Sequence, residues 1–251
     1  MRIGVIVLII GILWWTPSWL TKRLNKSYAE PTIISNHVTL LIAHPDDEAM
    51  FFGPTLDLLT REDHKNTVSI LCLSTGNDEG LGEIRRAELE ASAAIFGVPK
   101  EKVHVLDRPE LQDGMENEWD KTVVAEVIDE VVPSTQTIVT FDSEGVSGHI
   151  NHKSVYYGAL YYAKDHPGVT VWTLESVPVY RKYTAVLDGF FTTLVRTLLP
   201  SNTRVSTAAD YKAYQDARKA MVKAHVSQMK WFRYGWITLS RYMWFNELVR
   251  V

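Results

Sequence analysis

The sequence predicts an α/β fold in which a doubly wound, mostly parallel sheet carries helices on both faces. A chain of 251 residues with 46% hydrophobic residues is long enough to bury a full core. Five strand-length runs of β-branched or apolar residues alternate with segments of helical pattern, and this alternation is typical of parallel βαβ units. The sequence contains no internal repeat and no low-complexity linker that would divide the chain further.

The predicted strands are "HVTLLIA" at 37–43, "NTVSILCLS" at 66–74, "KVHVLD" at 102–107, "QTIVTFD" at 136–142 and "VTVWTLE" at 169–175. Each run has the length and the residue types that strands prefer. The single cysteine, Cys72, lies within the second run, so the chain has no disulfide framework and its thiol is expected to be buried.

Two segments between the strands have a clear helical pattern. The segment 82–98 ("GEIRRAELEASAAIFGV") has apolar residues at helical spacing and ends at Gly97, with Pro99 beyond it as a stop signal. The segment 119–132 ("WDKTVVAEVIDEVV") repeats the pattern and stops at Pro133. Both helices are expected to cover the sheet.

The N-terminal segment differs from the rest of the chain. Residues 3–20 carry no charge and would rise about 27 Å as a helix, which nearly spans a hydrocarbon core of about 30 Å. We predict a single transmembrane anchor at 1–21, a linker at 22–36 and a folded domain at 37–251. The alternative is a signal peptide cleaved near 27–29 ("SYA"), but Lys22 and Arg23 intervene between the apolar run and that site.

Charge sets the expected orientation and excludes one class of partner. Lys22, Arg23 and Lys26 follow the predicted span, whereas only Arg2 precedes it, so the positive-inside rule places the folded domain in the cytosol. The net charge of −4 and the pI near 6.1 give no basic excess for nucleic-acid binding.

Two polar clusters follow predicted strands. "LIAHPDDEAMFF" at 41–52 has His44, Asp46 and Asp47 directly after the first strand, and "FDSEGVSGHINHKSV" at 141–155 has His149 and His152 after the fourth. Ligands gather at the carboxyl ends of strands in such sheets, so the two loops are expected to meet. A lone histidine or a Pro-Asp-Asp turn is usually structural, but two clusters at two strand ends favour a metal site.

The chemistry of a zinc hydrolase needs this combination of residues. Two imidazoles and one carboxylate hold Zn²⁺ and leave a position open for water, whose pKa falls to about 7. A second carboxylate beside the site can then act as a base.

"AHPDDE" together with "GVSGHINH" resembles the LmbE-like, or PIG-L-type, de-N-acetylases, which are zinc hydrolases with a Rossmann-like sheet. The resemblance runs from about His37 to the C-terminal "HVSQMKWFRYGWITLSRYMWFNEL", and this tail is most similar to the eukaryotic branch that acts on N-acetylglucosaminyl-phosphatidylinositol. It implies an LmbE-like catalytic domain at 37–251 with membrane-proximal C-terminal helices.

The resemblance also implies roles for individual residues. His44, Asp47 and His152 would bind the metal, and Asp46 would be the general base. His149 would stabilise the oxyanion or protonate the departing amine. Asn151 would orient a ligand from the second shell, where relatives carry Asp.

Two further positions have weaker support. Gly82, Arg85 and Glu88 share the family spacing G-x-x-R-x-x-E, and the fork of Arg85 would suit a substrate phosphate or sugar hydroxyl, although a solvated helix face explains the pattern too. Asp113 and Gly114 could line the site, but turn chemistry explains them equally well.

The last third of the chain contains two strongly apolar helical patterns. "DGFFTTLVRTLLP" at 188–200 has a wide apolar face, and a second stripe runs through Met229, Phe232, Trp236, Leu239 and Met243. Such stripes are usually core, but basic and aromatic residues surround the second one and are typical of interfacial helices. Core packing and membrane contact remain alternatives.

The expected function is therefore a zinc-dependent deacetylase of N-acetylglucosaminyl-phosphatidylinositol in glycosylphosphatidylinositol anchor biosynthesis, on the cytosolic face of the endoplasmic reticulum membrane. One alternative is a deacetylase of another N-acetyl sugar conjugate. An iron oxygenase with a 2-His-1-carboxylate site is disfavoured because Asp46 has an obvious role only in hydrolysis. A non-catalytic membrane subunit is disfavoured because ligands and base are all present.

Overall fold

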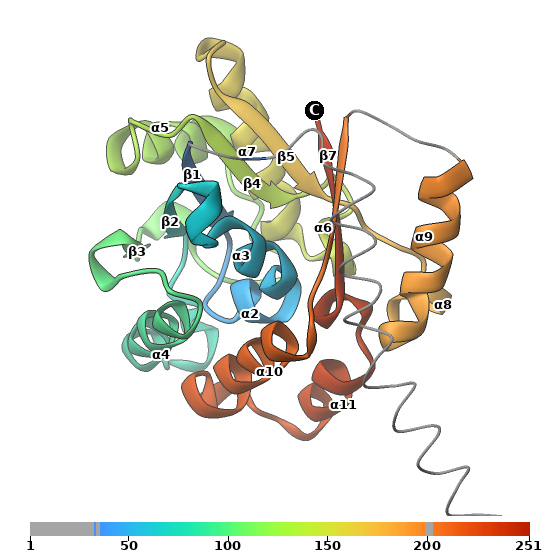
Figure 1. The fold of residues 1–251 in the computed structure, drawn as a ribbon. Helices are drawn as coiled ribbons and strands as arrows, with labels where there is room; N and C mark the ends of the chain where they lie inside the picture. Colours follow the sequence, from blue (N-terminus) through green and yellow to red (C-terminus); the bar gives the residue numbers. More distant parts are fainter. Residues whose placement is uncertain (1–32, 34–35, 199–202) are drawn as a thin grey trace, which may run out of the picture.

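The computed structural model describes residues 33, 36–198 and 203–251 (Figure 1). The predicted anchor at 1–21 lies outside the described residues, as does nearly all of the predicted linker at 22–36. Within the described ranges, no helix combines the length and the apolar character needed to cross a membrane.

A single seven-stranded sheet organises the described chain, in the order β3-β2-β1-β4-β5-β7-β6. Its strands are β1 (His37–Ile42), β2 (Thr67–Cys72), β3 (Val103–Val105), β4 (Thr137–Phe141), β5 (Thr170–Leu174), β6 (Arg204–Ala208) and β7 (Phe245–Arg250). The first five strands pair in parallel, whereas β7 is antiparallel to both β5 and β6. The predicted, mostly parallel α/β sheet is confirmed.

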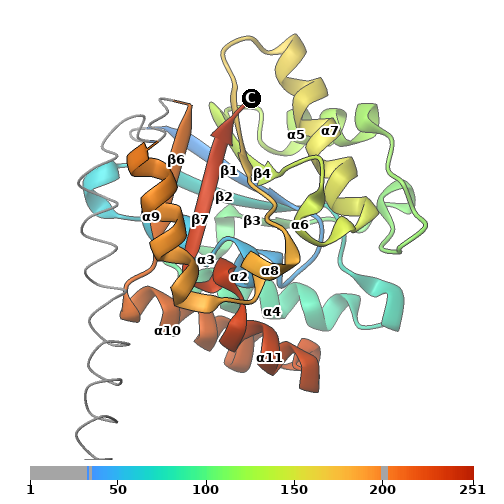
Figure 2. The same cartoon turned by 90° about the vertical axis from the view of Figure 1, so that its right-hand side faces the viewer.

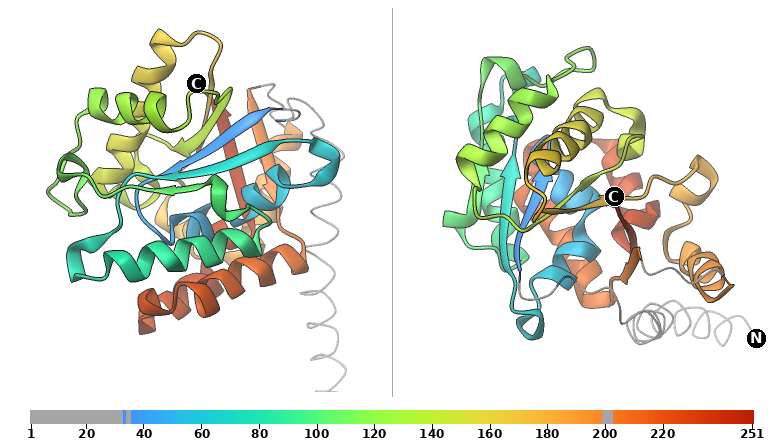
Figure 3. Two further views of the ribbon diagram at one scale, coloured as in Figure 1. Left: turned by 90° about the vertical axis from the view of Figure 1, so that its left-hand side faces the viewer. Right: turned by 90° about the horizontal axis from the view of Figure 1, so that it is seen from above.

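Helices cover both faces of this sheet, as Figure 3 shows from two sides. One face carries α5 (Lys121–Val131) and α7 (Ile150–Asp165). The other carries α2 (Asp47–Phe51), α3 (Gly53–Leu59), α4 (Gly82–Ile95), α10 (Tyr211–Lys219) and α11 (Trp231–Leu239). The predicted helices at 82–98 and 119–132 correspond to α4 and α5.

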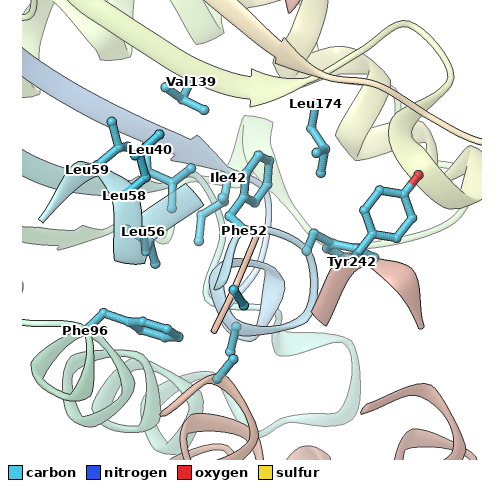
Figure 4. Packing of buried hydrophobic residues seen from close by; sticks show 14 of the residues in the cluster. Leu40, Ile42, Phe52, Leu56, Leu58, Leu59, Phe96, Val139, Leu174 and Tyr242 are labelled. Carbon is cyan, nitrogen blue, oxygen red and sulfur yellow. The ribbon is translucent and has the colours of Figure 1, made fainter. Parts of the chain in front are cut away.

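Successive side chains of β1 point to opposite faces of the sheet and so contribute to the hydrophobic core on each face. Leu40 and Ile42 belong to the larger core cluster, and Leu41 between them belongs to the cluster under α5 and α7. Phe52, at the junction of α2 and α3, packs beside Ile42 in the larger cluster (Figure 4). The chain turns sharply from β1 into α2 because both ends of this turn are fixed in the core.

The C-terminal segment departs from the helical prediction. The second apolar stripe was predicted as one helix, but α11 ends at Leu239, and Met243 lies in a short 3₁₀ turn before β7. Asn246 and Glu247 of β7 are buried, so the strand lacks an apolar pattern. Asn246 accepts hydrogen bonds from the backbone and the hydroxyl of Thr55, and this pairing compensates for its burial.

Candidate active site

A cavity of about 560 Å³ opens at the carboxyl ends of β1 and β4. Its polar wall comes from the loops that follow β1, β3 and β4, and its apolar wall comes largely from α11. The lining includes His44, Asp46, Asp47, Arg85, Asp113, His149, His152, Arg233 and Trp236. The two sequence clusters that were expected to meet therefore lie in one cavity.

The turn after β1 presents two aspartates in different ways. Asp46 has a φ of 107°, which is unusual for any residue except glycine and costs of order 1–3 kcal/mol. Asp47 begins α2, and its Oδ2 accepts hydrogen bonds from the backbone N–H groups of Ala43 at 3.1 Å and His44 at 2.9 Å. Asp47 Oδ1 is left to face the cavity side of the site.

His152, on the first turns of α7, meets that oxygen. Its Nε2 lies 3.2 Å from Asp47 Oδ1, and its Nδ1 lies 3.0 Å from the carbonyl oxygen of Gly145. Because a carbonyl only accepts, Nδ1 carries the proton and Nε2 keeps its lone pair. The ring also stacks on Phe141 of β4 with centroids 3.9 Å apart, which fixes its plane.

His44 is oriented in the same manner. Its Nε2 lies 3.0 Å from Asp113 Oδ1 and 3.0 Å from Asn151 Oδ1, while its Nδ1 lies 3.8 Å from Asp47 Oδ2. Asn151 also donates through Nδ2 to the carbonyl oxygen of Asn117, and this bond sets which amide atom faces His44. Nε2 of His44 is therefore the protonated nitrogen, and Nδ1 faces Asp47.

The described residues contain two groups that could hold a metal ion: His44, Asp47 and His152, and alternatively His44, Asp113 and His149. The first group fits better. All three of its residues are buried, and the unprotonated ring nitrogens, His44 Nδ1 and His152 Nε2, both lie beside the Asp47 carboxylate. A tetrahedral ion with bonds of about 2.0–2.1 Å needs ligand atoms about 3.3 Å apart, and His152 Nε2 lies 3.2 Å from Asp47 Oδ1. His44 Nδ1 lies 3.8 Å from the other oxygen of Asp47, Oδ2.

Charge stabilises the ionised form of the carboxylates. Burial alone would raise the pKa of Asp47, but the adjacent His152 and His44 hold that pKa well below its usual range. Burial is likewise outweighed at Asp113, whose pKa is lowered by its hydrogen bond with His44 and by the nearby Arg85. Both carboxylates are thus anionic at neutral pH and available as acceptors.

His149 sits at the N-cap of α7. Its Nδ1 accepts a hydrogen bond from the backbone N–H of Asn151 at 3.3 Å, so Nε2 carries the proton and lies 4.0 Å from Asp113 Oδ1. Burial and the neighbouring His44 and His152 lower the pKa of His149 to about 4. At neutral pH the ring is a neutral donor that lines the cavity.

Two arginines hold Asp46. Arg233 of α11 forms an ion pair with Asp46 Oδ2, and Arg85 of α4 lies 3.7 Å from the same oxygen. The fork of Arg85 already donates to the carbonyl oxygens of Gly76 and Pro45, each at 2.7 Å. Arg85 is buried, lines the cavity and supports the turn at 45–46 through these contacts.

Glu48 supports the same turn from below. Its Oε2 accepts the backbone N–H of Asp46 at 3.1 Å, and its Oε1 accepts from Ser92 at 2.5 Å and from His225 at 2.6 Å. Glu48 and His225 are fully buried. The C-terminal tail thus reaches the turn that presents Asp46, and its Ser227 makes two further hydrogen bonds to Glu88 of α4.

The comparisons with known proteins agree with this geometry. The family described as "GlcNAc-PI de-N-acetylase" (PIG-L) matches residues 39–163. A probable N-acetylglucosaminyl-phosphatidylinositol de-N-acetylase of Schizosaccharomyces pombe is 47% identical over 228 residues, covering 90% of this chain and 91% of the relative. The chain belongs to the PIG-L family.

A mammalian relative and a solved structure add to the PIG-L similarity and to the fold, respectively. The N-acetylglucosaminyl-phosphatidylinositol de-N-acetylase of Bos taurus is 36% identical over 248 residues, covering 96% of this chain and 94% of its own. Among solved structures, the N,N'-diacetylchitobiose deacetylase of Pyrococcus horikoshii has a TM-score of 0.57 at 16% identity, covering 97% and 91% of the two chains. At this identity the likeness shows a shared fold.

Sequence reasoning and the PIG-L structure differ at several site residues. The chain brings together His44, Asp46, Asp47, His149, Asn151 and His152, as the sequence predicted. Arg233 was counted only among the basic residues around the second apolar stripe, yet it pairs with Asp46. Asp113 was left undecided, although it follows β3 and the strand-end argument applies to it as well. No local signal links Arg233 or His225 to the turn at 46–48.

The Glu48–His225 pair yields a stability prediction. We expect His225→Ala to lower the free energy of unfolding by about 3–5 kcal/mol, because it leaves a fully buried carboxylate without its partner. Val226→Ala, at the exposed neighbouring position, is the matched control and should change stability by less than about 0.5 kcal/mol. Chemical denaturation in detergent measures both variants. Equal stability of the two would contradict a structural role for the pair.

Proposed function

We propose that this PIG-L chain hydrolyses the acetamide of N-acetylglucosaminyl-phosphatidylinositol, releasing acetate and glucosaminyl-phosphatidylinositol in glycosylphosphatidylinositol anchor biosynthesis. The observation that carries the proposal is the buried His44–Asp47–His152 group with a second carboxylate, Asp46, in the same cavity wall. The names and near-complete coverage of the curated relatives support the substrate.

The donor set suits a divalent metal, with Zn²⁺ the first choice. His44 Nδ1, a carboxylate oxygen of Asp47 and His152 Nε2 would hold the ion, and Asn151 and the Gly145 carbonyl would keep the two imidazoles in the required tautomers. A bound ion would supply a Lewis acid for the acetamide carbonyl and would make a neighbouring water more acidic.

Asp46 is the residue that takes the proton from the attacking water. Its Oδ2 is paired with Arg233, which leaves Oδ1 to accept the proton. Because the backbone at Asp46 is left-handed, the carboxylates of Asp46 and Asp47 point in different directions. Asp46 can therefore act as the base while Asp47 acts as a ligand. Arg85 acts as a positioning residue for the Asp46 carboxylate, and binding of a sugar hydroxyl would need one of its remaining N–H groups.

His149 serves the carbonyl oxygen of the substrate. Because its pKa is about 4, the ring is neutral before reaction, and its Nε2–H can donate to the oxygen on which negative charge develops. The proton taken up by Asp46 then goes to the departing amine. One water is consumed, and the acetic acid and the amine that are released ionise to acetate and an ammonium group at neutral pH, so the protein gains no net proton.

Two rivals are weaker. A deacetylase of another N-acetyl sugar conjugate would use the same residues, and only the substrate distinguishes it. An iron oxygenase or a non-catalytic subunit would have no use for a base braced by Glu48, Arg85 and Arg233.

Substitution separates the two aspartate roles. His152→Ala should lose both bound metal and activity, because two remaining ligands hold a divalent ion far more weakly. Asp46→Asn should keep its metal while turnover falls by about 10²-fold or more. Metal content by plasma emission spectrometry, measured beside acetate release, checks both variants. Full metal occupancy in His152→Ala would refute the ligand set, and metal loss in Asp46→Asn would mean that the aspartate roles are exchanged.

The substrate is tested by acetate release from purified full-length protein. We expect release from N-acetylglucosaminyl-phosphatidylinositol and from its soluble headgroup, N-acetylglucosaminyl-inositol phosphate, and little from free N-acetylglucosamine or N,N'-diacetylchitobiose. Asp46→Asn is the control for contaminating hydrolases. Preferred cleavage of a soluble N-acetyl sugar would favour the rival deacetylase.

We also propose an endoplasmic reticulum location with the catalytic domain in the cytosol. The basic residues at 22–26 and the buried, reduced Cys72 support this orientation. A glycosylation sequon tag added after Val251 should stay unglycosylated in microsomes and should be digested by protease without detergent. A glycosylated and protected tag would reverse the orientation.

A further inference from the structure

Helix α9 (Asp188–Leu198) is amphipathic in the reverse sense. Its polar residues Asp188 and Thr192 are 3% and 1% exposed, whereas Phe190, Leu194 and Leu198 are 50%, 58% and 68% exposed. A helix that packs on the core of a water-soluble domain buries its apolar face instead. The outer face of α9 is therefore adapted to an apolar contact that lies outside the described chain.

A buried polar network fixes this orientation. Asp188 receives a two-pronged contact from Arg181, with both N–O distances 2.8 Å, and it pairs with Arg241 at 2.8 Å. Thr192 donates to the same carboxylate at 3.1 Å. Rotating the apolar face inward would break these buried ion pairs, which is costly in a low dielectric. The outward apolar face is thus a built feature of the fold.

The apolar surface continues to the mouth of the cavity. Tyr183, just after α8 (Val179–Lys182), lines the cavity and contacts the Trp236 ring of α11 with centroids 5.7 Å apart. Trp231, at the start of α11, also lines the cavity and is 86% exposed. Figures 1 and 2 both show α8 between α9 and α11. We name this surface the apolar rim and define it by Tyr180, Leu187, Phe190, Leu194, Leu198 and Trp231.

Charge on the rim favours a phospholipid surface. The segments 176–198 and 225–240 contain one acidic residue, Asp188, which is buried. Lys230 and Arg233 lie in the second segment, but Lys230 pairs with the exposed Glu79 and Arg233 pairs with Asp46. Exposed tryptophan and tyrosine beside aliphatic residues, on two segments with no exposed carboxylate of their own, match the headgroup layer of a phospholipid bilayer.

We propose that the apolar rim docks on a phospholipid bilayer, with α9 and the start of α11 in the headgroup region and the cavity mouth facing the membrane. The inference rests on the proposed function in one respect: the acyl chains of the substrate stay in the bilayer while its sugar enters the cavity. Docking would bring Asp46 closer to the membrane surface, so the sugar would have a shorter distance to cross between the bilayer and the cavity.

A fluorescent probe on α9 tests the contact directly. The full-length chain carries Leu194→Cys labelled with an environment-sensitive dye and is reconstituted in phosphatidylcholine–phosphatidylinositol vesicles. We expect blue-shifted emission, shielding from aqueous iodide and quenching by spin-labelled lipid. The matched control is Tyr157→Cys, because Tyr157 is 49% exposed and belongs to α7, which Figure 2 shows well apart from α9. Unsubstituted protein reports any labelling of the buried Cys72.

Two probe outcomes would overturn the proposal. One is equal iodide access at Leu194→Cys and Tyr157→Cys in vesicles. The other is shielding of the Leu194→Cys probe without quenching by lipid, which would indicate a contact between copies of the chain. Both readouts are independent of catalysis, so they stand even if the proposed substrate is wrong.

An activity comparison supplies a second arm. The double variant Phe190→Ser/Leu194→Ser should act on the soluble headgroup at the unmodified rate but lose about tenfold or more on substrate embedded in vesicles, because each apolar side chain no longer leaves water. Neither residue lines the cavity. Equal loss on both substrates would contradict docking, and failure of the unmodified protein on both would instead contradict the proposed function.

Discussion

The site depends on one carboxylate held at the end of β1. Asp47 Oδ2 is fixed by two backbone N–H groups of its own turn, and Oδ1 is thereby aimed at His152. The turn needs Asp46 in a left-handed conformation, which is strained without support. Glu48 provides that support through the Asp46 backbone. In the proposed function, Asp46, Asp47 and Glu48 would thus serve in turn as base, ligand and support.

The support for the turn at 46–48 comes partly from the C-terminal part of the chain. His225 and Ser92 satisfy the Glu48 carboxylate, and Arg233 reaches Asp46 from α11. Burying a carboxylate is costly unless its oxygens have hydrogen-bond or ion-pair partners. The C-terminal tail supplies such partners, so it supports the turn at 46–48 in addition to covering the cavity. The same tail supplies the aromatic wall through Trp231 and Trp236.

The polar interior and the apolar exterior of α9 have a common cause. Arg181, Arg241 and Asp188 form a charged cluster that cannot face lipid or remain unpaired in the core. Placing this cluster inside, where its charges satisfy one another, frees the other face of α9 to carry Phe190 and Leu194 outward. The described domain thus offers an apolar surface next to a strongly polar cavity, which suits a substrate with a sugar at one end and acyl chains at the other.

The sequence by itself determined the parallel α/β fold and the meeting of the two polar clusters, because strand patterns are local and loops at strand ends converge. For the same reason it predicted that His44, an aspartate and a second histidine would meet, whereas the choice of Asp47 and His152 came from the resemblance to the PIG-L family. Only the tertiary structure decided the rest. β7 was missed because its buried Asn246 and Glu247 hide the strand pattern, and their burial depends on Thr55 and Arg181, which lie far along the chain. Arg233 and His225 reach the turn at 46–48 through a fold-back over more than 170 residues. The sequence also could not decide which face of α9 is exposed, because an apolar stripe has the same pattern whether it faces a core or a membrane. The structure decides this point because it buries the polar side of the helix.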